Sequence, residues 1–438
     1  MNRYLQAVRR ADLTRRVGHV SEYHGLIVES VGPDVFVGEL CEVHSSAPAR
    51  TVSAEVIGIR NGRVLLMPYE DLRGITYGAE VVATGESARA HVGDALLGRI
   101  VDAFGAPLDG GPPLRLSAEH PLYPNPINPL ARTRIDTVLE TGVRVIDTML
   151  TIGRGQRVAV ISGSGVGKST LLGMIARNMN ADVNVIALVG ERGREVRHFI
   201  EDSLGPEGLK RSVVVVATSD QPALVRRRAA FAAHAIAEYS RARGRHVVLT
   251  MDSVTRFAAA QREIGLAIGE PPTARGYTPM VFASLPRLLE RGGVTEGGSI
   301  TAFYTVLVEA DDLDDPISDS VRAIVDGHIA LDRGLANRGR HPAIDLFNSV
   351  SRLLTDLASG EERSLVKKTM KLLSVHAASR ELIEVGAYRA GSNPELDAAL
   401  KLLPALEEFL AQDAGTRTAR SEALQQLRAI LGSAKVSR

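Results

Sequence analysis

The stretch that decides the fold of this chain is Ile161-Ser162-Gly163-Ser164-Gly165-Val166-Gly167-Lys168-Ser169-Thr170. It follows an apolar run that begins at Val158 and precedes apolar residues at helical spacing from Leu171 to Ile175. A strand, a glycine-rich turn and Gly-Lys-Ser at a helix start form the arrangement that holds polyphosphate, because glycine lets backbone N–H groups approach the phosphates. The pattern therefore predicts a nucleotide-binding loop.

Each part of this loop has an expected task. Lys168 supplies a mobile cation for the phosphates, and Ser169 supplies a hydroxyl for Mg²⁺. One position departs from the usual pattern, because Ser162 stands five residues before Gly167 where glycine or alanine is usual. The expected nucleotide-binding residues are Gly163, Ser164, Gly165, Val166, Gly167, Lys168, Ser169 and Thr170.

Composition places the chain among ordinary globular proteins. Its 438 residues are 45% apolar and 24% charged, with a formal net charge of +1, so no whole-chain field points to nucleic acid or an anionic membrane. Cys41 is the only cysteine, which excludes an internal disulfide and suggests a small buried apolar residue in a reducing compartment. The first sixteen residues lack the apolar core of a signal peptide, and no apolar run reaches about eighteen residues. We expect a cytoplasmic protein.

The texture of the chain changes along its length. Residues 1–17 are basic and amphipathic, and both a partner-binding or membrane-surface helix and a frayed terminus fit them. From Gly18 to about Thr84, short β-type runs alternate with turn signals, which predicts a small barrel or sandwich. These expected strands are 25–31, 35–40, 54–59 and 62–67.

The middle and end of the chain have different patterns. Residues 94–135 are rich in glycine and proline and resemble a connection wrapped over the next domain. Near-continuous apolar runs then alternate with helical patterns, which predicts a parallel sheet covered on both faces. After about residue 360 the pattern is helical. The expected buried strands are 158–162, 185–189, 213–217, 247–251, 300–308 and 328–331.

Carboxylates follow two of these strands, at the sheet edge where ligands bind. Asp252 ends the run from Val247 and is placed to hold Mg²⁺ across from Ser169; its alternative role is a helix cap or turn residue. Glu191 follows Val189 and is placed to polarise a water molecule near the γ-phosphate. A loop of mutually paired charges fits Glu191 equally well on spacing alone.

An acidic segment and a histidine receive no functional role from their sequence pattern. The acids of 311–315 are expected to form a solvated turn or to pair with neighbouring arginines rather than to hold a metal. His341 precedes a proline, and its chemistry alone assigns it no role.

A set of motifs in a fixed order carries a resemblance to a known family. The chain resembles the catalytic subunit of rotary ATP synthases, and more closely the hexameric export ATPase of bacterial type III systems, from about Gly18 to about Leu431. The segment 385–397 is most similar to the flagellar branch. The motifs are 140–147, 163–169, 190–195, 252–256, 275–279, 297–301 and 349–352.

The resemblance implies a fold and its boundaries. We expect an α/β protein with a RecA-like P-loop core built on a parallel sheet, preceded by a small N-terminal β barrel and followed by a helical C-terminal domain. The expected divisions are a flexible segment at 1–17, the barrel at 18–93, the ATPase domain at 94–359 and the helical domain at 360–438.

The resemblance also implies roles in Mg²⁺-dependent ATP hydrolysis. Glu191 becomes the catalytic carboxylate and Lys168 the β/γ-phosphate lysine, while Arg192 supports the geometry at the phosphates. Arg352 becomes an arginine finger that reaches into the site of the neighbouring subunit, which implies a homo-hexameric ring. The family commonly has tyrosine at the adenine-stacking position, where this chain has His341, and imidazole offers less stacking surface.

The resemblance finally implies partners and a place of action. It implies export-apparatus regulator and stalk proteins, export chaperone–substrate complexes, and peripheral association with the membrane export gate, in the cytoplasm. The expected function is to energise export of flagellar proteins, with an injectisome ATPase as the alternative. An RNA translocase and a non-catalytic rotary subunit are further alternatives. Few aromatic residues in 18–84 disfavour nucleic acid as a partner, and Glu191 disfavours the non-catalytic subunit.

Overall fold

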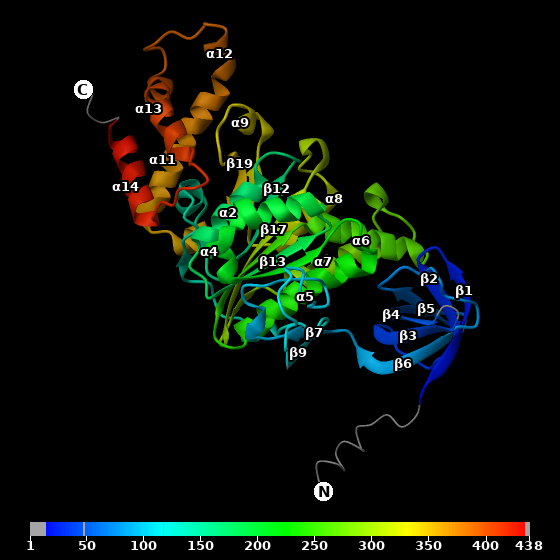
Figure 1. The fold of residues 1–438 in the computed structure, drawn as a ribbon. Coiled ribbons are helices and arrows are strands. Elements are labelled where there is room, and N and C mark those ends of the chain that lie inside the picture. Colours follow the sequence, from blue (N-terminus) through cyan, green and yellow to red (C-terminus); the bar gives the residue numbers. More distant parts are fainter. Residues whose placement is uncertain (1–14, 47–48, 117, 434–438) are drawn as a thin grey trace.

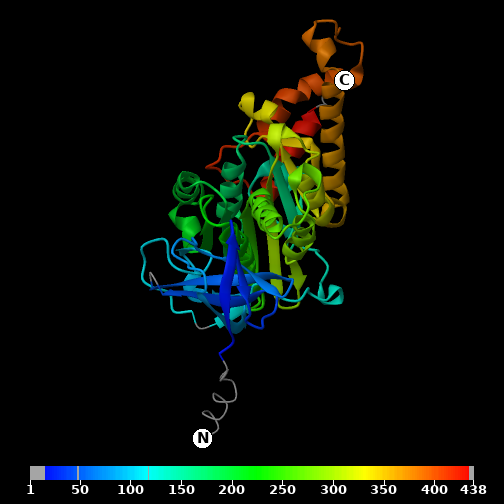
Figure 2. The same ribbon diagram turned by 90° about the vertical axis from the view of Figure 1, so that its right-hand side faces the viewer.

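The computed structural model describes residues 15–46, 49–116 and 118–433 of the chain. A β barrel and a group of long helices lie at opposite ends of a central domain built on one large sheet (Figures 1 and 2). No helix within the described residues combines the length and the apolar character that crossing a bilayer requires. The predicted segment 1–17 falls outside the described residues as far as residue 14.

The barrel is closed by six antiparallel strands in the order β1-β2-β5-β4-β3-β6. Its interior is filled by small and branched apolar side chains, among them Val28, Cys41, Val56 and Val81, each fully buried. The expected barrel and the expected burial of Cys41 are thus confirmed. The strands are β1 (Val17–His24), β2 (Ile27–Val31), β3 (Glu39–Ser46), β4 (Ala49–Arg60), β5 (Arg63–Pro68) and β6 (Glu80–Ser87).

One predicted barrel strand is wrong in position. The sequence predicts an extended run at 35–40, but the chain turns at Val37 and Gly38, and β3 begins only at Glu39. The carboxylate of Glu39 is buried and accepts hydrogen bonds from the backbone N–H groups of Phe36 and Gly85, at 3.0 and 2.8 Å, and from Arg16 at 2.8 Å. Satisfying this buried charge requires a loop around it, which overrides the apolar pattern.

The connection between barrel and sheet contains short strands of its own. β7 (Arg89–Val92) pairs with β9 (Ala118–Pro121), and β8 (Ile100–Val101) adds a parallel edge strand beside β14 (Ser212–Ala217) of the large sheet. The connection therefore belongs partly to the central domain. Its remaining elements and the next ones are η1 (Asp94–Leu96), η2 (Pro129–Ala131), β10 (Val138–Leu139), η3 (Ile146–Leu150) and β11 (Ile152–Gly153).

The central sheet has the order β19-β18-β12-β17-β15-β13-β14-β8. Six central strands pair in parallel, as the apolar runs predicted, and β19 at one edge runs antiparallel to β18. β16 (Gly293–Thr295) pairs with β17 in a hairpin. The bounds are β12 (Arg157–Ser162), β13 (Val183–Val189), β14 (Ser212–Ala217), β15 (His246–Asp252), β17 (Gly298–Leu307), β18 (Gly327–Leu331) and β19 (Ile344–Ser351).

Alternate strand residues face two separate cores. Ala159 and Ile161 pack on one face with α5, α6 and α7, whereas Val158 and Val160 pack on the other with α2 and the C-terminal helices. The expected two-sided burial is confirmed (Figure 1). The helices between the strands are α2 (Lys168–Asn178), α3 (Gly193–His198), η4 (Phe199–Leu204), α4 (Gly205–Lys210), α5 (Ala223–Arg241), α6 (Val254–Ala267), η5 (Ala274–Gly276), α7 (Pro279–Leu289), η6 (Glu309–Asp311), α8 (Pro316–Ile324) and α9 (Arg333–Asn337).

The C-terminal part is helical, as the sequence predicted. A capping box begins its first long helix, because the Ser359 side chain accepts from the Glu362 N–H and the Glu362 carboxylate accepts from the Ser359 N–H. Arg420 ties the last helix to Glu362 at 2.8 Å. The helices are α10 (Leu354–Leu357), α11 (Gly360–Ala378), α12 (Arg380–Glu384), α13 (Pro394–Leu410) and α14 (Arg420–Gly432).

A buried ion pair joins the barrel to the central domain. Arg227 of α5 donates to the Glu55 carboxylate of β4 at 2.5 Å, and the other Glu55 oxygen accepts from the Tyr69 hydroxyl at 2.6 Å. The guanidinium also lies over the Tyr123 ring, 5.6 Å from its centre. Both charged side chains are at most 10% exposed, so each depends on the other for neutralisation.

We predict that Arg227→Ala lowers the free energy of unfolding by about 3–5 kcal/mol, because Glu55 is left buried and uncompensated. The double variant Glu55→Gln with Arg227→Met recovers most of this loss, since it removes both charges. Urea unfolding followed by circular dichroism measures the effect, with exposed Arg243→Ala as the matched control. A loss in the control as large as in Arg227→Ala would contradict the role of the buried pair.

Candidate functional site

The glycine-rich loop lies between the end of β12 and the start of α2. Gly165 and Gly167 have φ of 78° and 101°, a backbone region that favours glycine. Within the described residues, no side chain caps the N-terminus of α2, so its first N–H groups and its helix dipole face the loop. Ser162 is buried at the end of β12, and its hydroxyl has no hydrogen-bond partner among the described residues. The loop therefore offers an anion site.

Three charged side chains meet behind this loop. Lys168, the first residue of α2, contacts the carboxylate of Asp252 through a short ion pair, and its Nζ lies 3.9 Å from Oε1 of Glu191. Asp252 also accepts a 2.8 Å hydrogen bond from the Thr305 hydroxyl. These residues come together because β12, β17, β15 and β13 are parallel neighbours whose carboxyl ends share one edge. The structure thus brings the expected phosphate lysine and both expected carboxylates into one cluster.

Glu191 is the electrostatically unbalanced member of the cluster. Its side chain is 9% exposed, and its Oε1 has no hydrogen-bond partner among the described residues. Burial, and then the negative charge of Asp252, raise the pKa of Glu191 to about 7, while Lys168 opposes the shift. A carboxyl group with a pKa near neutrality, next to a phosphate-binding loop, suits proton transfer from water.

The donor set in front of the cluster fits a hard divalent cation. Ser169 lies exposed at the start of α2, next to Lys168, and the Asp252 carboxylate ends the neighbouring strand β15. Hydroxyl and carboxylate oxygens are the ligands that Mg²⁺ takes in proteins, together with phosphate oxygens and water.

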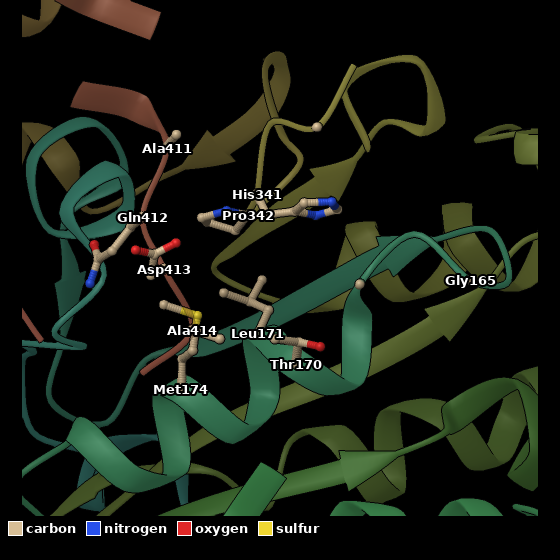
Figure 3. Close-up of a pocket in the computed structure, with 12 residues that line it drawn as sticks. Gly165, Thr170, Leu171, Met174, His341, Pro342, Ala411, Gln412, Asp413 and Ala414 are labelled. Carbon is tan, nitrogen blue, oxygen red and sulfur yellow. The ribbon is translucent and has the colours of Figure 1, made fainter. Parts of the chain in front are cut away.

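A cavity of about 460 Å³ opens beside the loop and α2. Figure 3 shows His341 and Pro342 on one side, Leu171 and Met174 of α2 below, and the segment 411–414 opposite. His341 Nδ1 lies 3.7 Å from the position that a Cβ on Gly167 would take, so the imidazole borders the phosphate loop. Among the described residues that line the cavity, this imidazole is the one aromatic ring.

The cavity wall formed by 411–414 was not predicted from the sequence. Gln412 holds it in place: its N–H donates to the His341 carbonyl at 2.7 Å, its amide nitrogen donates to Gly142 at 2.8 Å, and its amide oxygen accepts from the Arg144 N–H at 2.8 Å. No local signal marks this segment, because all three partners are distant along the chain, and Gly142 and Arg144 lie about 270 residues earlier. The cavity wall is a product of tertiary packing.

Two predicted arginines lie away from Lys168. The Arg192 side chain is 64% exposed and pairs with Glu195 at 3.5 Å. Arg352 follows β19, and its N–H donates to Asp326, whose own N–H donates to Arg157 at the start of β12. The phosphate loop begins at the other end of β12, five residues or about 17 Å further along.

A further arginine, to which the sequence assigned no role, lies next to the site. Gly190, directly before Glu191, has φ of 73°, and a Cβ there would lie 2.7 Å from the Arg256 Cβ. The exposed Arg256 therefore packs against the Glu191 loop, and its charge is one of those that oppose the rise in the Glu191 pKa. The signal was its place four residues after Asp252.

Comparisons with known proteins place the chain in a family. The nucleotide-binding domain of the ATP synthase alpha/beta family matches residues 142–351, its beta-barrel domain matches residues 20–85, and the T3SS EscN ATPase C-terminal domain matches residues 358–429. The flagellum-specific ATP synthase of Bacillus subtilis (strain 168) is 50% identical over 430 residues, which are 98% of each chain. The chain belongs to the ATP synthase alpha/beta family, in its flagellar and type III secretion branch.

Other relatives of this protein come from both flagellar and type III secretion systems. The flagellum-specific ATP synthase of Salmonella typhimurium is 49% identical over 94% of this chain and 93% of its own length. The type 3 secretion system ATPase of Xanthomonas euvesicatoria is 45% identical over 96% of this chain and 95% of its own length. The assembled ATPase EscN of enteropathogenic E. coli matches with a TM-score of 0.90 and 42% identity, over 94% of this chain and 100% of that one. The suspected family is therefore confirmed.

We predict that His341→Tyr tightens ATP binding by this family member about two- to tenfold, because a phenol ring stacks more surface on a base than imidazole does. His341→Ala weakens binding for the same reason. Titration with a fluorescent ATP analogue measures both changes, with His376→Tyr, on α11 and outside the lining of the cavity, as the control. Unchanged affinity in both His341 variants would mean that the base binds elsewhere.

Proposed function

We propose that this protein hydrolyses ATP with Mg²⁺ at the glycine-rich loop, and that this activity energises protein export. The observation that carries the proposal is the buried cluster of Lys168, Asp252 and Glu191 at an uncapped helix N-terminus. A structural ion pair needs one acid for one lysine, whereas hydrolysis needs a phosphate lysine and two separate carboxylates. Membership of the ATP synthase alpha/beta family supports the same reaction.

The residues divide the work of hydrolysis. The backbone N–H groups of 163–170 and the Lys168 ammonium bind the phosphates. On binding them, Lys168 gives up its ion pair with Asp252. Ser169 and Asp252 would then hold Mg²⁺, which neutralises phosphate charge when bound. Glu191 orients the attacking water and accepts its proton, and Arg192 supports the loop that carries Glu191.

The position of Arg352 supports an arginine finger that acts on a neighbour. Because β19 is antiparallel, Arg352 lies at the end of the sheet where the parallel strands begin, and its own phosphate loop lies at the end where they finish. It is therefore placed to serve another subunit rather than its own. The assembled state of the related EscN supports such an arrangement. We infer a homo-hexameric ring with head-to-tail contacts, in which each active site combines Glu191 of one subunit with Arg352 of the next.

Flagellar protein export is the function that the relatives favour. Several relatives at 45–50% identity are flagellum-specific ATP synthases, while type 3 secretion system ATPases at 45–46% keep the injectisome as the alternative. The structure of EscN with its central stalk EscO matches with a TM-score of 0.87, which supports a stalk partner here. We also propose regulator proteins, chaperone–substrate complexes and a membrane export gate as partners of a cytoplasmic ring.

We predict that Glu191→Gln lowers hydrolysis by about two or more orders of magnitude while ATP binding stays near that of the wild type. The amide keeps size and hydrogen bonding but cannot accept a proton. Because the acid form of Glu191 is favoured below its raised pKa of about 7, kcat/KM of the wild type falls as the pH drops through about 7. Phosphate release measured from about pH 5.5 to about pH 8.5 gives both results.

Two variants serve as controls for Glu191. Lys168→Ala loses both binding and turnover, and Glu201→Gln, at an acid that is 56% exposed and pairs with Arg197 rather than with the cluster, keeps both. Normal turnover in Glu191→Gln would instead make Glu191 a loop ion-pair residue and refute its role as the base. Filament growth in a flagellar mutant strain, restored by the wild type and not by Glu191→Gln, tests the flagellar assignment.

We predict that Arg352→Ala is almost inactive yet binds ATP, because an arginine supplied by a neighbour contributes about 10³ to 10⁵ in rate. Specific activity of the wild type rises with protein concentration as rings form. Mixed rings of Arg352→Ala and Glu191→Gln regain part of the activity, because some sites combine an intact Glu191 with an intact Arg352. Native mass spectrometry confirms mixing, and phosphate release measures recovery.

A conservative substitution tests the chemistry of the finger. The variant Arg352→Lys keeps the charge but loses the planar fork, so it recovers only a small part of the rate. If mixed rings form and no activity returns, while wild-type activity is flat with concentration, Arg352 acts within its own subunit.

A further inference from the structure

Two loops leave the central sheet side by side. β12 and β17 are parallel neighbours in which Ser162 pairs with Leu307, and the Val308 N–H donates to the Ser162 carbonyl at 3.0 Å. The phosphate loop follows β12, and an acidic loop with Asp311 follows β17. The two loops therefore start in contact.

Asp311 lies directly against the phosphate loop. A Cβ built on Gly163 would lie 1.9 Å from Oδ1 of Asp311 and 2.7 Å from Nη2 of Arg333, so the ion pair of these two side chains occupies the space that a side chain at 163 would need. Asp311 is itself exposed and has a left-handed backbone with φ of 58°. A side chain at 163 would therefore displace the paired ends of Asp311 and Arg333.

A third loop neutralises this carboxylate. Arg333, which begins α9 just after β18, donates to Asp311 through Nε at 2.7 Å and through Nη2 at 3.2 Å. β18 flanks β12 on the side opposite to β17. The phosphate loop is therefore held between the loops of both neighbouring strands, and a two-bonded ion pair connects them.

The pairing has an electrostatic meaning at this place. An unpaired carboxylate next to a loop that binds polyphosphate repels the ligand, whereas a carboxylate paired with a guanidinium does so much less. The other acids of this segment pair elsewhere, Asp312 and Asp315 with Arg275, and Asp314 with Arg322. The arginine pairing expected from the sequence is confirmed for these acids, and Asp311 adds the contact with Gly163.

We propose that Asp311 and Arg333 are positioning residues of the nucleotide site: the neutralised carboxylate packs against Gly163 and fixes the start of the phosphate loop. This inference rests on the proposed ATP hydrolysis. The pair touches the loop and not the reacting atoms, so it acts by holding the backbone N–H groups in their phosphate-binding positions.

A double-variant cycle tests the packing. Gly163→Ala puts a methyl group into the carboxylate, so kcat/KM for ATP falls by about 10²-fold, as expected when a site is misplaced by about 1 Å. Asp311→Gly, which suits the left-handed backbone, lowers kcat/KM by only about tenfold. The double variant returns to the level of Asp311→Gly alone, because Arg333 has lost its partner and its flexible side chain can move away from the methyl group. Activity of Gly163→Ala equal to the wild type, or a double variant no better than Gly163→Ala, would overturn the proposal.

A second pair of variants tests the charge. Arg333→Ala leaves Asp311 unpaired and weakens ADP and ATP binding, ATP more because it carries more negative charge, and added salt reduces the difference. Arg333→Ala with Asp311→Asn regains affinity, since the repelling charge is gone. A merely structural Arg333 would give equal losses for both nucleotides, no salt dependence and no recovery, and that result would refute the inference.

A control variant in the same loop distinguishes a failure of the positioning role from a failure of ATP hydrolysis itself. Asp312→Ala removes a paired acid from the same loop without touching Gly163, and Arg275 keeps Asp315, so it binds and hydrolyses ATP as the wild type does. Thermal unfolding checks that each variant is folded. If wild-type protein hydrolyses ATP and the Gly163–Asp311 cycle fails, the positioning role alone is wrong; if the wild type is inactive as an assembled ring, the proposed function is wrong.

Discussion

The interaction on which the rest of this structure depends is the buried contact of one lysine with two carboxylates. Lys168 can neutralise Asp252 or Glu191, but not both, and burial makes the remaining charge costly. The charges of the cluster are therefore balanced only when a further cation, or a proton on Glu191, joins it. Parallel strands make the cluster possible, because they bring residues from distant parts of the chain to the same edge of one sheet.

The two faces of the sheet connect this cluster to different parts of the molecule. On one face α5 carries Arg227, which pairs with Glu55 on the outside of the barrel, so the barrel and the strands share α5 as a support. On the other face α2, which begins at Lys168, shares its core with α13 and α14. Gln412 continues that link to the His341 carbonyl. The helical end of the molecule is thus packed against the nucleotide helix, while the barrel is packed against the helices behind it.

Those parts of the site that strand ends and local motifs determine were predictable from the sequence. Lys168, Asp252 and Glu191 each directly follow, or nearly follow, a long apolar strand, so their meeting followed from the parallel order. The wall at 411–414 and the contact of Asp311 with Gly163 depend on how distant segments dock, which no local pattern records. The strand expected at 35–40 failed because a buried Glu39 needs a loop of donors, and β8 has only two residues, too few to form a pattern.

The reversed direction of β19 has a consequence for a cell that makes two forms of the chain. A parallel strand in the place of β19 would end on the same side of the sheet as the phosphate loop. β19 runs the other way, so Arg352 lies at the opposite ends of the strands. In the proposed ring, the Arg352 of each subunit acts in the neighbour's site, and the site of each subunit depends on the Arg352 of another chain. In a cell that makes intact and altered Arg352 chains together, an intact subunit would lose its activity wherever its neighbour in the ring is altered.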